Sequence, residues 1–168
     1  MTKHTRLALV TGSSRGIGKA IALDFAKNGL DILVTGRNST RLETVKREIE
    51  ENGVKGHVVS ADLGAEDGIQ KIHKYILARD LSVDILVNNA AIIHPRLSLL
   101  DFEMLEWERV IDVNLIAAVK LTKLLLPDMI SANYGKIINI SSIGGRKGAA
   151  GRSAYRVTKA ALISFTES

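Results

Sequence analysis

Several kinds of residue are missing or scarce in this chain of 168 residues, and each shortage excludes a class of function. The chain contains no cysteine, which excludes disulfides, thiolate catalysis and thiolate metal sites, and no other metal site is predicted. No apolar run is long enough to cross a membrane, and the opening MTKHTRLALV is too short before the first glycine to predict a secretory leader. We therefore expect a cytoplasmic protein with no membrane partner.

Aromatic residues are also scarce, at 4% of the chain, and the net charge of +5 is spread along it. Proteins that bind nucleic acids usually gather their basic side chains on one face, often with aromatic residues among them. We therefore expect no nucleic-acid partner. One local group of basic residues, with no acid among them, stands apart: Arg146, Lys147, Arg152, Arg156 and Lys159.

Short apolar runs alternate with longer amphipathic stretches, and only two prolines interrupt the pattern. The apolar runs are nearly continuous, which is typical of strands buried on both faces; they are 6–11, 31–36, 56–61, 84–90 and 135–142. Helices are predicted over 16–28, 38–52, 66–79, 102–133 (as one helix or two pieces) and from 153 onward. This order predicts one α/β domain over 1–168, with a doubly wound parallel sheet of about five strands and helices on both faces.

Small, polar or glycine-rich residues follow every predicted strand, in the order TGSSRGIG, GRN, ADL, NNAA and ISS. In an open parallel sheet, ligands bind outside the carboxyl ends of the strands. TGSSRGIG, residues 11–18, also opens a helix, whose free N–H groups and positive dipole end suit a diphosphate. Its spacing differs from the G-x-G-x-x-G fingerprint, so taken alone it is equally consistent with a plain glycine-rich turn.

The end of the second predicted strand bears on which dinucleotide is bound. Sites for NAD usually place an acid there to hold the ribose 2′-hydroxyl, but this chain reads VTGRN over 34–38. Arg37 stands at that point, and Arg15 from the first loop could join it. Two guanidinium groups suit a 2′-phosphate, which predicts NADP (as NADPH) in preference to NAD. The alternative is that both arginines are ordinary exposed loop residues.

Taken together and in order, TGSSRGIG, NNAA, Asn114, the pair Ser141–Ser142 and YRVTK (155–159) resemble the short-chain dehydrogenase/reductase (SDR) family along the whole chain. The match is most like its 3-oxoacyl-acyl-carrier-protein reductases. The resemblance implies a Rossmann fold and hydride transfer between a nicotinamide and a carbonyl or alcohol carbon. It also implies a homo-dimer or tetramer.

The resemblance assigns roles to individual positions. Catalytic roles are implied for Asn114, Ser142, Tyr155 and Lys159. Cofactor contacts are implied for Gly12, Ser14, Arg15, Gly16, Ile17, Gly18, Arg37, Asp62, Leu63, Asn88, Ala90, Tyr155 and Lys159.

Physical reasoning supports the implied chemistry of Tyr155 and Lys159. Four residues apart on a helix, they would share one face, and a neighbouring ammonium favours the ionised phenol. Tyr155 could then give a proton to a ketone oxygen as hydride arrives, while the Ser142 hydroxyl bonds that oxygen. The alternative is that such a pair arises by chance on a solvated helix. The basic group of residues nearby favours an acidic or carrier-linked substrate.

The chain departs from the family pattern in two places. Ala91 stands where the motif after the fourth strand usually has glycine, and we expect a modest effect. Family members also continue past this chain's last residue, with two more strands and a substrate-covering region. We therefore expect the strand at 135–142 to form a sheet edge and turnover to be weak or absent. The alternative to an active reductase is an impaired fragment that only binds NADP(H), or an interaction protein.

Overall fold

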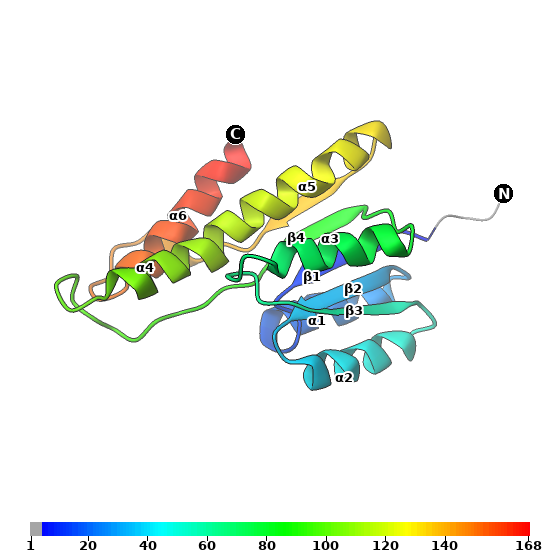
Figure 1. Cartoon of the computed structure of the whole chain (residues 1–168), viewed down its shortest axis with the longest axis horizontal. Coiled ribbons are helices and arrows are strands. Elements are labelled where there is room, and N and C mark those ends of the chain that lie inside the picture. The colour runs from blue at the N-terminus through cyan, green and yellow to red at the C-terminus, as the bar shows by residue number, and fades with distance from the viewer. Residues whose placement is uncertain (1–4) are drawn as a thin grey trace.

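The computed structural model describes residues 5–168, and the first four residues of the opening stretch discussed above lie outside it. The described residues form one parallel sheet in the order β3-β2-β1-β4-β5. Its strands are β1 (Leu7–Thr11), β2 (Asp31–Gly36), β3 (Gly56–Ser60), β4 (Ile85–Asn88) and β5 (Lys136–Asn139). The predicted α/β, Rossmann-type fold is confirmed, with every predicted strand present (Figure 1).

The helices between the strands also match the predicted order. They are α1 (Gly16–Lys27), α2 (Ser39–Glu50), α3 (Gly68–Ala78), α4 (Met104–Ile111), α5 (Ala117–Ser131) and α6 (Ser153–Glu167). A π-helical turn, η1 (Asp112–Ile116), joins α4 to α5, and a short 3-10 helix, η2 (Ile143–Gly145), follows β5. The stretch predicted over 102–133 is therefore one continuous helical segment, which also contains Pro127. No helix within residues 5–168 combines the length and apolarity needed to cross a membrane.

The sheet carries a hydrophobic core on each face because successive side chains of a strand point to opposite sides. Leu7 and Leu9 of β1 belong to a core with α3 and α5, and Figure 1 shows those two helices side by side over the sheet. Ala8 and Val10 belong to a second core with α1 and α2. Burial on both faces explains why the strands read as nearly continuous apolar runs.

The element order brings the strand ends together at one edge of the sheet. Neighbouring strands β1 and β4 are separated along the chain by two strands and three helices, and the order of connections reverses between them. That reversal is the position at which open α/β sheets bind ligands. Among the strands of residues 5–168, β5 pairs only with β4 and forms the predicted sheet edge, where Ile138 is 39% exposed.

Candidate active site

The loop between β1 and α1 requires glycine at particular positions. Gly12 adopts a φ of +64°, and a Cβ there would lie 2.8 Å from the Cα of Ala90. At Gly18, a Cβ would lie 2.5 Å from both the Gly12 carbonyl oxygen and the side-chain nitrogen of Asn89. No side chain fits either space, so the loop after β1 lies directly against the loop after β4.

Hydrogen bonds join these two loops. The Thr11 hydroxyl, buried at the end of β1, accepts from the backbone N–H groups of Asn89 and Ala90, both at 2.9 Å. It donates to the carbonyl of Val87 at 3.1 Å. The Asn89 amide donates to the carbonyls of Thr11 at 2.8 Å and Gly12 at 3.2 Å. The base of the glycine loop is thus fixed by protein contacts alone.

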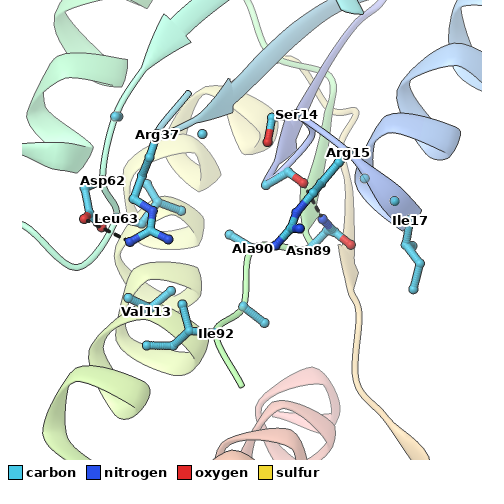
Figure 2. Close-up of a pocket in the computed structure, with 16 residues that line it drawn as sticks. Ser14, Arg15, Ile17, Arg37, Asp62, Leu63, Asn89, Ala90, Ile92 and Val113 are labelled. Carbon is cyan, nitrogen blue, oxygen red and sulfur yellow. Dashed lines mark hydrogen bonds and ion pairs between the residues drawn. The ribbon is translucent and has the colours of Figure 1, made fainter. Parts of the chain in front are cut away.

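A cavity of about 510 Å³ opens over this joint, and Figure 2 shows the side chains that surround it. Most of the predicted cofactor contacts line it: Gly12, Ser14, Arg15, Gly16, Ile17, Gly18, Arg37, Asp62, Leu63 and Ala90. The wall also includes residues for which no role was predicted: Gly36, Ala61, Asn89, Ala91, Ile92 and Val113. The cavity therefore extends from the glycine loop past the ends of β2 and β3 to the π-helical turn η1.

Charged side chains gather where the cavity passes the ends of β2 and β3. A nitrogen of Arg37, after β2, lies 3.9 Å from an oxygen of Asp62, after β3 (Figure 2). The other Asp62 oxygen accepts from the N–H of Gly64 at 3.0 Å, which orients the carboxylate. Arg37 is 60% exposed, so its guanidinium can turn toward a ligand without losing a buried bond.

The two asparagines after β4 lie in different surroundings. Asn88 is buried and does not line the cavity, because its amide donates to Asn139 of β5 at 2.9 Å and more weakly to Thr122 of α5 at 3.4 Å. Asn89, which the sequence reading did not single out, forms part of the cavity wall. The alternation of side chains along β4 gives a reason for this difference. A cofactor contact by Asn88 stays a prediction.

Ala91 lines the cavity and its side chain is exposed there. The non-glycine residues with positive φ in the described part of the chain are Asp80 and Asn133, so the backbone of Ala91 does not need glycine. The methyl group of Ala91 therefore forms part of the cavity wall, and the backbone of the loop adopts an ordinary conformation there.

Asn114 lies in the π-helical turn and is buried, with 1% of its surface exposed. Its side-chain oxygen accepts from the N–H of Ile92 at 2.8 Å, and its nitrogen donates to the Ile92 carbonyl at 3.0 Å. The same nitrogen lies 3.3 Å from the hydroxyl of Thr158 on α6. Short π-helical turns inside helices often occur at functional sites, and this one ties the loop after β4 to α6. A water-relay role for Asn114 stays a prediction.

Lys159 is buried on α6, with 2% of its surface exposed. Its ammonium donates to the Ile140 carbonyl at 2.6 Å and lies 5.8 Å from the centre of the Tyr155 ring. Burial lowers the pKa of Lys159 to about 8, because a charged ammonium is less favourable away from water. The lysine thus lies beside Tyr155 and carries a proton that it releases more readily than an exposed lysine does.

Ser142, which precedes η2, and Tyr155 of α6 both lie close to Gly144 of η2. The Ser142 hydroxyl accepts from the N–H of Gly144 at 3.1 Å. A Cβ on Gly144 would lie 3.5 Å from that hydroxyl oxygen and 3.7 Å from a ring carbon of Tyr155. A Cβ on Gly145 would lie 2.7 Å from the Lys159 carbonyl, so the two glycines allow η2 to approach α6 closely. Ser142, Tyr155 and Lys159 are not among the residues that line the 510 Å³ cavity.

The sheet order and the position of the cavity define a class of protein, the open parallel α/β folds in which ligands bind outside the carboxyl ends of the strands. Residues 6–168 match the model of the short chain dehydrogenase family. The chain belongs to that family, as its resemblance predicted.

Two curated relatives of this chain are reductases. Over 97% of its length, the chain is 42% identical to the 3-oxoacyl-[acyl-carrier-protein] reductase FabG of Aquifex aeolicus (strain VF5), covering 66% of that protein. It is 38% identical to FabG of Staphylococcus aureus (strain Mu50 / ATCC 700699), covering 68% of that protein. The chain thus spans about two thirds of the length of these relatives.

Solved structures of family members superpose closely on the chain. A metagenomic short-chain oxidoreductase in complex with NADP is 36% identical, with a TM-score of 0.91 over 96% of this chain and 73% of that one. An NAD⁺-bound xylitol dehydrogenase is 31% identical, with a TM-score of 0.88 over 96% of this chain and 62% of that one. Structural similarity therefore extends to proteins that bind either dinucleotide.

Proposed function

We propose that the protein is an NADP(H)-dependent oxidoreductase that transfers hydride between the nicotinamide and a carbonyl or alcohol carbon. The observation that carries the proposal is that one cavity is bounded by the glycine loop at one end and by Arg37 at another. Gly12, Gly16 and Gly18 line this cavity at the start of α1, where free backbone N–H groups suit a diphosphate. The cofactor's adenosine would then extend toward Arg37, Asp62 and Leu63.

The choice of NADP over NAD rests on charge. The position after β2 carries Arg37 where an acid would hold a ribose 2′-hydroxyl, and Arg15 lines the same cavity. Two exposed guanidinium groups favour a phosphate through charge-assisted hydrogen bonds. One related structure holds NADP and another holds NAD⁺, so the proposed preference for NADP rests on Arg15 and Arg37.

When bound, the nicotinamide supplies or accepts the hydride, and this chain's residues manage the proton. Tyr155 gives its hydroxyl proton to the carbonyl oxygen in reduction and takes one back in oxidation. The hydroxyl of Ser142, across Gly144 from the Tyr155 ring, donates to the same oxygen and stabilises its developing charge. Lys159 favours the ionised phenol and holds the ribose hydroxyls.

The proposed substrate is a 3-oxoacyl thioester on an acidic carrier protein. Arg146 and Lys147 are exposed directly after η2, the short helix that Ser142 precedes. Arg156 is held in place by donating to the carbonyls of Gly144 at 2.9 Å and Ala149 at 3.0 Å, so it shapes this loop. The FabG relatives, named for that substrate, support the proposal.

The test is a titration of the purified protein with NADPH and NADH, followed by fluorescence, and then an assay of acetoacetyl-carrier-protein reduction. We expect tighter binding of NADPH than of NADH, and NADPH oxidation that depends on the thioester, even at a low rate, would support the reductase activity. Binding without turnover on the thioester and on small ketones would favour the alternative, a protein that only binds NADP(H). Absence of binding to either dinucleotide would overturn the proposal.

A further inference from the structure

A second arginine reaches Asp62 from a helix that carries no assigned role. A nitrogen of Arg109, on α4, lies 3.8 Å from the same Asp62 oxygen that Arg37 approaches at 3.9 Å. The side chain of Arg109 is 46% exposed. Within residues 5–168, neither Arg109 nor Arg37 forms an ion pair with any other residue. One carboxylate is therefore shared by two guanidinium groups that come from different elements.

The backbone holds this arrangement in place. Val113 lies four residues after Arg109 along the helical segment and lines the cavity, which puts Arg109 near the cavity rim. A Cβ on Gly64, two residues after Asp62, would lie 2.7 Å from a methyl carbon of Val113. The absence of a side chain at Gly64 thus lets the loop carrying Asp62 lie against the helix carrying Arg109.

The charges explain what the second arginine would do. Asp62 and Arg37 alone sum to zero, and a bare carboxylate beside a 2′-phosphate would repel it. With Arg109 the cluster carries one net positive charge. Both nitrogens lie farther from the carboxylate than a hydrogen bond allows, so Arg37 can turn to the phosphate while Arg109 continues to neutralise Asp62.

We propose that Arg109 is a positioning residue for NADP selectivity: it offsets the charge of Asp62 and thereby frees Arg37 for the 2′-phosphate. This inference rests on the proposed function. It predicts that Arg109 affects the binding of NADPH and hardly affects that of NADH, because only NADPH carries the 2′-phosphate.

The test measures the dissociation constants of NADPH and NADH for the wild-type protein, R109Q, R109K and R47Q. Arg47 is an exposed arginine of α2 outside the cavity, so R47Q controls for the loss of one positive charge. We expect R109Q to weaken NADPH binding about three- to fivefold and NADH binding less than twofold. R109K, which keeps the charge, should retain most of the preference. The apo proteins should unfold at similar temperatures.

The same measurements in a D62N background separate the proposed role from direct phosphate binding. If Arg109 acts through Asp62, R109Q should change NADPH binding less than twofold once that carboxylate is gone. An equally large effect in D62N, or an effect of R109Q no greater than that of R47Q, would overturn this inference alone. A wild-type protein that binds neither dinucleotide would overturn the proposed function as well.

Discussion

Asn114 and Ile92 are joined by a pair of hydrogen bonds, of 2.8 Å and 3.0 Å, between one buried side chain and both polar groups of one backbone residue. Replacing Asn114 by alanine leaves both groups of Ile92 without this partner. We expect Asn114→Ala to lower the free energy of unfolding by about 2 to 3 kcal/mol in urea denaturation. Asn52→Ala is the matched control, because its amide bonds an exposed helix carbonyl at 2.9 Å. Equal losses in the two variants would contradict the structural role of Asn114.

Gly12 and Gly53 both have positive φ, but only Gly12 lacks space for a side chain. A left-handed residue with a Cβ costs about 1 to 2 kcal/mol, and Gly53→Ala should show that cost alone. Gly12→Ala should lose more stability and also weaken nucleotide binding, because its Cβ would press on Ala90. Thermal unfolding and NADPH titration of both variants measure the difference. Identical behaviour of the two would argue against a closed joint between the loops.

Lys159 predicts a dependence of stability on pH. Burial lowers its pKa in the folded protein to about 8, from an ordinary value of 10.5. Between these pH values the unfolded chain holds the proton more tightly than the folded one does, so stability rises with pH. Relative to Lys159→Met, the wild-type protein should gain about 3 kcal/mol in free energy of unfolding from pH 7 to pH 10.5.

Urea denaturation at several pH values measures this gain, and Lys123→Met, which replaces an exposed lysine on α5, serves as the control. Lys123→Met should follow the wild-type pH curve. Parallel curves for the wild-type protein and Lys159→Met would mean that Lys159 keeps an ordinary affinity for its proton.

Tyr155 should be dispensable for folding and required for turnover. Tyr155→Phe removes only the hydroxyl, which forms no hydrogen bond within residues 5–168, so we expect unchanged thermal stability. The rate of thioester reduction should fall at least about 100-fold, because the proton donor is lost. Tyr134→Phe is the control, since the Tyr134 ring stacks under Arg6 with 4.3 Å between guanidinium carbon and ring centre. Retained activity in Tyr155→Phe would contradict the proposed mechanism.

Much of the fold could be predicted because it depends on local patterns. Strands buried on both faces must be apolar throughout. The loop after β1 is recognisable in the sequence because positions with no space for a side chain are glycines. The structure shortens the last strand to Lys136–Asn139, because the chain leaves the sheet before the serine pair. The pattern of apolar and polar residues over 135–142 does not predict that the strand ends at Asn139.

Other features lie beyond sequence reasoning because they depend on contacts between distant segments. The π-helical turn at 112–116 differs from an α-helix in that its backbone hydrogen bonds span five residues and not four, which no residue type in the sequence marks. Alternation along β4 predicts that Asn88 and Asn89 face opposite sides, but the partner of Asn88 depends on the position of β5. Asp62 precedes β4 in the sequence and Arg109 follows it, and no sequence motif links the two residues.

The bonds from Asn89 to Thr11 and Gly12 span 78 and 77 positions of sequence. A nucleotide bound over this joint would contact segments that come together only when β1 and β4 pair. Its binding energy would therefore oppose global unfolding, with no need to order a local loop first. Amide hydrogens of the central strands should exchange more slowly, and together, once a nucleotide is bound. A bound nucleotide would thus stabilise the whole sheet, because it contacts the loops of two paired strands.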